Sequence, residues 1–482
     1  MGDEFTLDPT DWEEVRRAFH AAADLCISQM EGVREQPVWR PTPADVKSHF
    51  QSQTPRHGAG LDELLDEFKT HILPYGAGNV HPRFWGWVQG SGTMAGALAE
   101  MLAAFMNSNV GGRDHVALYI ERQVIGWCKD IFSFPESASG ILTSGTSMGT
   151  MIALNVARNA KADSDVQTHG LGSARRLVGY ASAEAHGCNS KAFDMLGLGR
   201  GSLRMVPVDD QFRLLPDALK SRISADKEAG LQPFVVIASV GTVNTGAIDD
   251  LVAISKICRD ENLWLHIDGA FGGLARLTSR FRAELDPMAL ADSIAFDFHK
   301  WLHVPYDAGC VIIKDEVAHR MAFSARREYL VSTDQGLAGG DPWYCDYGPE
   351  LSRGFRALKI WFTFRSYGVE RLAASIEQNC DQALHLAALV DETPDLERLA
   401  PVHLNIVCFR FVSDDGASAM NALNKNIVAR LQLDGIAAPS TTTISGTTMI
   451  RVCITNHRTR SEDLALLVSE VRRIGRSLIS PQ

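Results

Sequence analysis

The chain has 482 residues, of which 45% are apolar and 22% are charged, as is typical of a globular protein with a sizeable core. At roughly 100–200 residues per domain, this length predicts more than one packed unit. The net charge of −11 argues against nucleic acid or an anionic membrane as partner, because both are negatively charged. The nine cysteines include no C-x-x-C pair, so we expect reduced thiols, a cytoplasmic location and no metal site.

Residues 1–85 are predicted to form an N-terminal helical arm. Apolar residues recur every three or four positions from Asp8 to about Leu73, behind an Asp-Pro-Thr-Asp start signal. The region is too small for a large core of its own, so we expect it to lie across another domain or another subunit. No targeting segment or membrane span is predicted, because Glu100 interrupts the most apolar stretch, residues 93–110.

Residues 86–375 are predicted to form a large α/β domain, and residues 376–482 a small α+β domain. Short β-rich runs alternate with helical runs in the first, a pattern typical of parallel βαβ units with helices on both faces of a sheet. The β-rich runs are Gly140–Thr143, Arg176–Ala181, Leu203–Pro207, Pro233–Val240, Leu263–Ile267, Ser293–Phe298 and Gly309–Ile313. In the small domain, two β-like runs, Leu404–Phe411 and Thr448–Ile454, precede a helix that starts at Ser461.

A small polar turn follows the first β-rich run of the large domain. Backbone N–H groups at the start of the next helix, with the hydroxyls of Thr146 and Ser147, would form a phosphate cradle. The same residues also spell G-x-S-x-G from Gly145 to Gly149, the nucleophile elbow of α/β-hydrolases, with Ser147 as the nucleophile. A third interpretation is that the small residues only allow close helix–sheet packing. The spacing leaves all three open.

Two further strand ends carry charged residues. Asp268 ends an apolar run at the edge where open α/β sheets bind ligands, so it either caps the next helix or faces a ligand. Lys300 is either a solvated surface residue or an amine suited to a Schiff base with an aldehyde; in the second case we expect burial and positive neighbouring charge to lower its pKa. The 32 residues between them correspond to about one βα unit, so both can face one ligand.

With these motifs, the chain resembles the group II pyridoxal phosphate-dependent amino-acid decarboxylases, the family of the aromatic-L-amino-acid and glutamate decarboxylases. The similarity extends from about Asp8 to the C-terminus. Its most specific segment runs from Ser293 to Trp301 and continues in Asp307-Ala308-Gly309-Cys310. The resemblance implies the type I fold of pyridoxal phosphate enzymes (aspartate aminotransferase-like), pyridoxal 5′-phosphate as cofactor, and a homodimer with its active sites at the subunit interface.

The resemblance also implies roles for individual residues. Lys300 would bind the cofactor covalently, Asp268 would pair with its protonated ring nitrogen, and His186 would stack on its ring. The other implied cofactor contacts are Thr146, Ser147 and His299 on the phosphate side, Ala270 packed against the ring, and Thr242 with a hydroxyl near the cofactor. Thr242 could equally close a turn.

Tyr329 occupies the position of the family's catalytic tyrosine, within a segment that resembles the mobile loop closing over the substrate. Relatives with phenylalanine there tend to be oxidative aldehyde synthases, so Tyr329 favours plain decarboxylation, with the tyrosine protonating the product carbon. The expected reaction converts an L-amino acid, with aromatic ones favoured, to the amine and carbon dioxide. An aldehyde synthase or another pyridoxal phosphate-dependent lyase stays open, because fold and cofactor do not fix the reaction.

The substrate preference also stays open. The aromatic-substrate branch has a tyrosine, a second aromatic residue and a proline where this chain has Trp87, Val88 and Gln89. Trp87 could stack on an aromatic side chain, whereas Gln89 could reach a polar or acidic one. Basic positions of the family that could bind a carboxylate or form a salt bridge are Arg353, Arg356 and Arg458.

Overall fold

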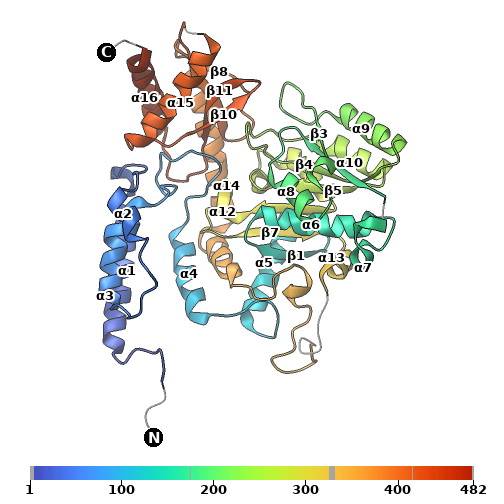
Figure 1. Cartoon of the computed structure of the whole chain (residues 1–482), viewed down its shortest axis with the longest axis horizontal. Helices are drawn as coiled ribbons and strands as arrows, with labels where there is room; N and C mark the ends of the chain where they lie inside the picture. The colour runs from blue at the N-terminus through green and yellow to red at the C-terminus, as the bar shows by residue number, and fades with distance from the viewer. Residues whose placement is uncertain (1–4, 174, 325–331, 415, 480–482) are drawn as a thin grey trace.

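The computed structural model describes residues 5–173, 175–324, 332–414 and 416–479. A seven-stranded sheet forms the centre of the molecule, and a smaller sheet lies towards its C-terminal end (Figure 1). The strands of the large sheet follow the order β1-β7-β6-β5-β4-β2-β3. Their bounds are β1 Ser139–Thr143, β2 Leu177–Ser182, β3 Leu203–Val206, β4 Gln232–Ser239, β5 Trp264–Asp268, β6 Ser293–Asp297 and β7 Gly309–Ile313.

The large sheet is mainly parallel, which confirms the predicted α/β class. Neighbouring strands from β3 to β6 run parallel, and only β7 runs against its neighbours β1 and β6. Strands β1, β2, β5, β6 and β7 are buried at every position, as expected where helices cover both faces. Each predicted β-rich run therefore becomes a strand, with ends that shift by one residue at most.

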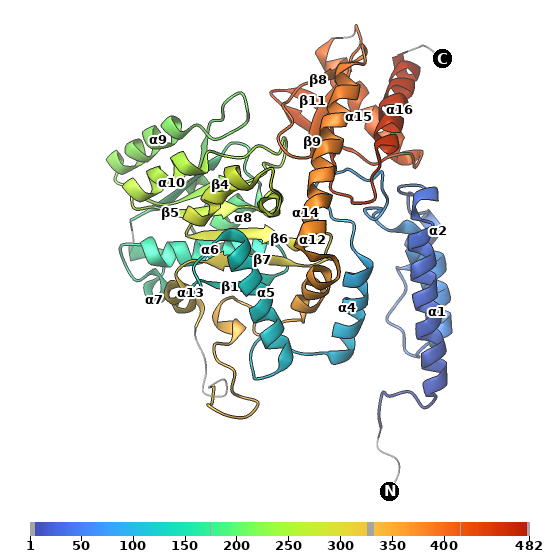
Figure 2. The same cartoon turned by 180° about the vertical axis from the view of Figure 1, so that it is seen from behind.

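Helices pack on both faces of this sheet (Figures 1 and 2). The long helix α6 contacts most of the strands on one face, whereas α5, α9 and α10 pack on the other. The helices of this part of the chain are α4 Met94–Met106, α5 Val116–Phe132, α6 Thr146–Lys161, α7 Val166–His169, α8 Cys188–Met195, α9 Pro216–Glu228, α10 Leu251–Asp260, α11 Arg282–Leu285, α12 Phe298–Trp301, α13 Glu316–Phe323 and α14 Arg356–Asp391.

The C-terminal sheet is antiparallel and has a hydrophobic core of its own, which it shares with three helices. Its strands follow the order β10-β11-β9-β8. The elements are β8 Leu396–Arg398, β9 Ile406–Phe411, α15 Ala417–Leu433, β10 Ser440–Ile444, β11 Thr447–Cys453 and α16 Ser461–Ile479. The predicted runs correspond to β9 and β11. Strand β10 escaped prediction because it consists of serine and threonine apart from its last residue, so it carries no apolar pattern.

The N-terminal arm contains α1 Trp12–Glu31, α2 Ala44–His49 and α3 Leu61–Glu67. The predicted start signal is confirmed, because Asp11 accepts hydrogen bonds from the backbone N–H groups at the start of α1. Only Ala18 of α1 is buried, and the arm lies beside α4 at one side of the molecule (Figure 2). The arm is thus only lightly packed against its own chain.

Helix α14 links the two sheets. It packs against α4 and α5 at one end and against α16, β8 and β9 at the other, so the boundary expected at residue 375 falls inside one helix. The division into three units stays a prediction. Among the helices formed by the described residues, none has both the length and the apolarity that a membrane span requires.

Candidate active site

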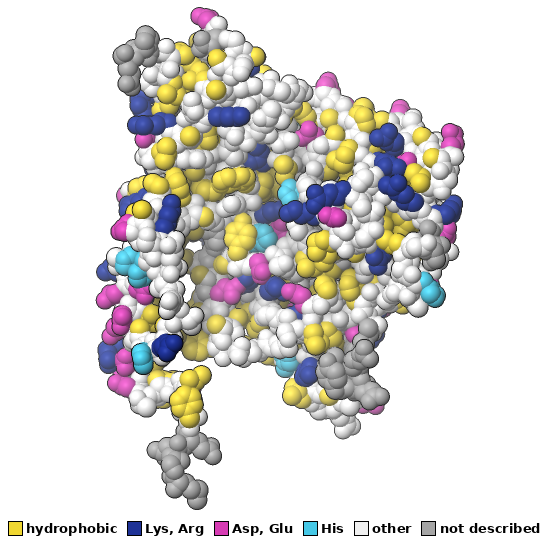
Figure 3. Space-filling view, viewed as in Figure 1, with side chains coloured by type: hydrophobic (Ala, Val, Ile, Leu, Met, Phe, Trp, Pro, Cys, Tyr) yellow, Lys and Arg dark blue, Asp and Glu magenta, His cyan; other side chains and the backbone are white. Residues whose placement is uncertain are grey.

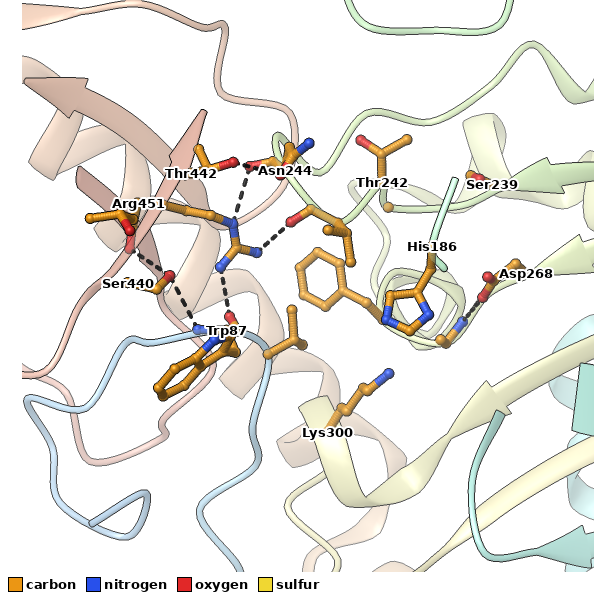
Figure 4. A pocket seen from close by; sticks show the side chains of 16 residues that line it. Trp87, His186, Ser239, Thr242, Asn244, Asp268, Lys300, Ser440, Thr442 and Arg451 are labelled. Atoms are coloured by element: carbon orange, nitrogen blue, oxygen red, sulfur yellow. Dashed lines mark hydrogen bonds between the residues drawn. The ribbon is translucent and has the colours of Figure 1, made fainter. Parts of the chain in front are cut away.

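Three of the predicted side chains meet at the carboxyl ends of strands β2, β5 and β6 of the large sheet. Asp268 ends β5, Lys300 lies on α12 directly after β6, and His186 lies in the loop after β2 (Figure 4). With Ala270 and Thr242, they line a cavity of about 300 Å³. The strand ends that the spacing placed opposite one ligand therefore do face one cavity.

Asp268 is a buried carboxylate at the base of the cavity. Its Oδ1 accepts a hydrogen bond from the N–H of Ala270 at 3.2 Å. Burial raises the pKa of Asp268, whereas the nearby charge of Lys300 acts in the opposite direction. A carboxylate desolvated in this way gains most from a cationic partner. The site is therefore suited to a protonated nitrogen beside Asp268.

His186 offers a neutral ring to the cavity. Its Nδ1 accepts the N–H of Cys188 at 3.2 Å, which places the ring proton on Nε2. Burial lowers the pKa of His186, although the charge of Asp268 opposes this shift. The imidazole is nevertheless solvent-exposed, because it borders the open cavity. Its flat face is available for stacking.

Lys300 is paired with a carboxylate that the sequence analysis did not single out. Its Nζ lies 2.9 Å from Oδ2 of Asp297, the last residue of β6. Burial alone would lower the pKa of Lys300, but the charge and hydrogen bond of Asp297 raise it on balance. The expectation of a lowered pKa is therefore wrong for the chain in this state. The available signal was the position of Asp297, three residues before the lysine, which faces it across one helical turn.

The start of α6 lies beside the same carboxylate. Thr146, the first residue of this 16-residue helix, donates its N–H to Oδ1 of Asp297 at 2.7 Å. Its hydroxyl is buried and has no partner among the described residues. Ser147 is exposed, and His299 is buried, with its Nδ1 accepting the N–H of Ala308 at 3.0 Å. An unpaired buried hydroxyl at a helix N-terminus is suited to a phosphate oxygen.

Two glycines allow this turn to approach β7. A Cβ at Gly309 would lie 2.5 Å from Cα of Gly145 and 2.8 Å from Oδ1 of Asp297. Such contacts are far shorter than van der Waals separation, so only glycine fits at position 309. The close approach brings the strand, the turn and the carboxylate together.

The wall opposite Lys300 combines apolar and polar side chains (Figure 4). Its apolar members are Trp87, Val88, Val243 and Phe271, and its polar members are Asn244, Ser440, Thr441, Thr442 and Arg451. Only Trp87 was predicted among these. Ser440, Thr441, Thr442 and Arg451 escaped prediction because β10 and β11 reach the cavity from the C-terminal sheet, far along the chain.

Arg451 holds three segments of this wall together. Its guanidinium donates to the carbonyl oxygens of Trp87 at 2.8 Å, Val243 at 2.6 Å and Asn244 at 3.2 Å. Gln89 is not among the residues that line the cavity, and its carbonyl accepts a hydrogen bond from Thr455 at 2.7 Å. The structure thus brings Trp87 to the site and does not bring Gln89 there.

Thr242 uses its hydroxyl to close a turn, which was the alternative interpretation. Its Oγ1 accepts the N–H of Ala247 at 3.0 Å and lies 3.2 Å from the hydroxyl of Thr245. The residue still lines the cavity. Tyr329 lies outside the described residues.

The three basic candidates have structural partners. Arg353 forms an ion pair with Glu121 in which both side chains are fully buried. Arg356 pairs with Asp307 and Glu350, each at 3.0 Å. Arg458 donates to the carbonyl of Ser91 at 3.2 Å. For Arg353 and Arg356, the salt-bridge alternative is therefore the one the structure shows.

The profile of the family described as "Pyridoxal-dependent decarboxylase conserved domain" matches residues 43–412. The chain belongs to this family. It is 32% identical over 470 residues to the aromatic-L-amino-acid decarboxylase of Bacillus atrophaeus, with 96% of each chain covered. It is 29% identical to the phenylacetaldehyde synthase of Arabidopsis thaliana, with 93% of each chain covered.

Solved structures of similar proteins share the fold. The structure described as Oryza sativa TDC with PLP and tryptamine superposes with a TM-score of 0.91 at 24% identity, over 98% of this chain and 100% of that one. The predicted family and fold are therefore confirmed. The residue roles implied by the resemblance stay predictions.

This pyridoxal-dependent decarboxylase uses pyridoxal 5′-phosphate, and its residues fit that cofactor. Lys300 would supply the amine for covalent binding, Asp268 the carboxylate beside the ring nitrogen, and His186 the stacking ring. Thr146, with its unpaired hydroxyl, and the start of α6 would hold the phosphate. When bound, the cofactor supplies an electron sink for the bond that breaks at the substrate's α-carbon.

The hydrolase interpretation of Ser147 finds no support in this site. A nucleophilic serine needs a base within hydrogen-bonding reach. Within the described part of the chain, no hydrogen bond joins Ser147 to a histidine, whereas its neighbour Thr146 contacts the carboxylate beside Lys300. The turn is therefore better explained as part of the cofactor site of a decarboxylase.

Proposed function

We propose that this decarboxylase acts on an aromatic L-amino acid and releases the corresponding amine and carbon dioxide. The observation that carries the proposal is the apolar wall opposite Lys300. Trp87, Val88 and Phe271 offer flat and branched apolar surface, and Phe271 is itself stacked on Trp301 at a centroid distance of 5.0 Å. An aromatic side chain in this slot would be stabilised by desolvation and by offset stacking.

The residues of the site divide the work as follows. Asp268, buried and anionic when paired, would stabilise positive charge on the cofactor's ring nitrogen as electrons move into the ring. His186, as a neutral imidazole, would stack on the cofactor's ring and keep that ring in place. Lys300 would leave and re-form its covalent link as substrate enters and amine departs. Tyr329 is predicted to protonate the product carbon.

A panel of the common L-amino acids, assayed for carbon dioxide and amine with the reconstituted enzyme, tests the substrate. We expect the highest kcat/KM for an aromatic amino acid. Trp87→Ala should lower that kcat/KM about tenfold, the order expected for losing one stacked aromatic contact. Phe50→Ala, which removes an aromatic side chain of similar exposure outside the cavity, should leave it unchanged. A preference for aliphatic amino acids would contradict the proposal.

Arg451 favours a second candidate, an acidic amino acid. Its guanidinium lines the cavity and donates to three backbone carbonyls, and no ion pair joins it to a carboxylate within the described residues. A positive charge in that wall would attract a second carboxylate. If glutamate is the best substrate in the panel and Arg451→Met abolishes its turnover, this candidate replaces the first. Production of aldehyde and peroxide instead of amine would indicate an aldehyde synthase.

The protein is proposed to act as a homodimer through the arm and α4. On the face seen in Figure 3, the arm carries scattered apolar side chains among charged ones. Both the arm and α4 expose large apolar side chains: α4 exposes Leu98 and Phe105 at 48% and 67%, and α1 exposes Trp12 at 61%. Surfaces of this kind usually mark interfaces. We favour a second copy of the chain as the partner, because the arm packs only lightly against its own chain and can pack against another subunit. A cytoplasmic location is proposed as well, since the cysteines are free thiols.

Light scattering with size-exclusion chromatography tests the dimer. We expect the wild-type mass to be twice that of one chain. Replacing Leu98 and Phe105 together by Asp should give monomers, whereas Val252→Asp, at an exposed apolar position on α10, should not. A monomeric wild type would contradict the proposal.

A further inference from the structure

Asp297 connects the lysine to the start of α6 through one carboxylate. Its Oδ2 lies 2.9 Å from Nζ of Lys300, and its Oδ1 accepts the N–H of Thr146 at 2.7 Å. The side chain is only 3% exposed. His299 is the next cationic candidate, with Nε2 3.7 Å from Oδ2. A buried carboxylate in this position must be compensated, and Lys300 is the group that compensates it.

The backbone around Asp297 encloses its carboxylate closely. Gly309 lets β7 pass so close that a Cβ there would lie 2.8 Å from Oδ1 of Asp297. Gly145, in the turn before α6, would place a Cβ 3.6 Å from the same oxygen. The carboxylate is thus enclosed by the strand, the turn and the lysine. The side chain of Asp297 therefore has little freedom to move away from Lys300 or from the N–H of Thr146.

Asp297 dominates the electrostatics of Lys300. Burial lowers the pKa of Lys300, but the charge and hydrogen bond of Asp297, with smaller contributions from Asp268 and Cys188, act in the opposite direction and together raise it. The titratable groups that face Lys300 from its own and neighbouring elements are Asp297, His299, Tyr306, Asp268, His186, Cys188 and Cys453. Lys300 is therefore an ammonium in the cofactor-free chain.

We propose that Asp297 is a positioning residue that keeps Lys300 protonated before the cofactor binds, so that loading of the cofactor requires Lys300 to lose this proton first. The inference rests on the cofactor and is independent of the amino acid that the enzyme decarboxylates. It concerns the entry of Lys300 into its covalent link, a step at which only a neutral amine is nucleophilic.

The step balances as follows. The ammonium of Lys300 first gives one proton to solvent water. The nitrogen lone pair then forms a bond to the aldehyde carbon of pyridoxal phosphate. The carbonyl oxygen leaves as water with the two remaining amine hydrogens, and a carbon–nitrogen double bond replaces the carbon–oxygen double bond. No oxidant or reductant takes part.

The test measures cofactor loading without any amino acid. Cofactor-free protein is mixed with pyridoxal phosphate over a range of pH, loading is followed by visible absorbance, and the product is trapped with borohydride and located by mass spectrometry. We expect the wild-type rate to rise with pH. In Asp297→Asn, which keeps an oxygen for the N–H of Thr146, the midpoint should move to lower pH by at least about one unit, equivalent to about tenfold faster loading at a given pH below it.

Asp292→Asn is the matched control. Asp292 directly precedes β6, and its Oδ2 accepts the N–H of Leu265 at 2.8 Å, but Lys300 is not its partner. Its profile should coincide with the wild type. An Asp297→Asn midpoint equal to or above that of the wild type would overturn the proposal. An incorrect substrate proposal would give a different result: the cofactor would load normally, but aromatic amino acids would yield no amine.

A second measurement keeps the proposal testable if Asp297→Asn does not fold, as judged by circular dichroism. In the wild type, labelling by pyridoxal without phosphate is compared at Lys300 and at the exposed Lys425 as pH rises. Labelling of Lys300 should require the higher pH, because Asp297 stabilises its ammonium form. Labelling at an equal or lower pH would overturn the proposal.

Discussion

The fully buried ion pair between Glu121 and Arg353 is expected to be the most costly single contact to break. Arg353 approaches the two carboxylate oxygens of Glu121 at 2.6 and 3.1 Å. The same guanidinium donates to the carbonyl of Leu142, and Glu121 accepts the N–H of Leu142, so the pair also fixes β1. Strand β1 leads directly into the cofactor turn at Gly145.

Glu121→Gln leaves the charge of Arg353 buried without its counter-charge. Breaking one side of a fully buried pair costs about 3–5 kcal/mol, which is a large part of a typical unfolding free energy of about 5–15 kcal/mol. The double variant Glu121→Gln with Arg353→Met removes both charges. It should lose less than the sum of the two single variants, because no uncompensated charge remains.

Urea unfolding of the holoenzyme, followed by circular dichroism, measures these losses. The control is Asp260→Asn, which breaks an exposed ion pair with Lys256 and should cost no more than about 0.5 kcal/mol. Cofactor affinity should fall along with stability in Glu121→Gln, because β1 positions the turn. A loss below about 1 kcal/mol, or additive losses in the double variant, would refute the reasoning.

Two further outcomes follow from the site and the core. Gly309→Ala should weaken pyridoxal phosphate binding at least about tenfold, because its Cβ would overlap Gly145; equilibrium dialysis measures this, and Gly126→Ala, with open space around it, should bind normally. Burial lowers the pKa of His266 and of His319 to about 3. As the pH falls, these histidines therefore bind protons in the unfolded chain before they do so in the folded chain. The unfolding free energy should therefore fall by up to about 1.4 kcal/mol per pH unit per histidine below about pH 6.5. Urea midpoints at several pH values test this, and midpoints that do not change with pH would contradict it.

The sequence by itself determined which segments along the chain form the strands of the large sheet and which charged residues follow those strands. Continuous apolar runs separated by helical periods can be recognised locally, which is why every strand from β1 to β7 was placed within a residue. Asp268 and Lys300 were found for the same reason, since each lies within two residues of the end of such a run. Family resemblance then supplied the cofactor.

Only the tertiary structure decided the charge state and the walls of the site. Asp297 pairs with Lys300 and raises its pKa, because a helical turn and two glycines bring that carboxylate to both the lysine and α6. Arg451 and the hydroxyl-rich β10 reach the cavity from the other sheet, and nothing local in their sequence marks them. Distances between segments far apart in the chain depend on packing, and a linear pattern of residues does not contain them.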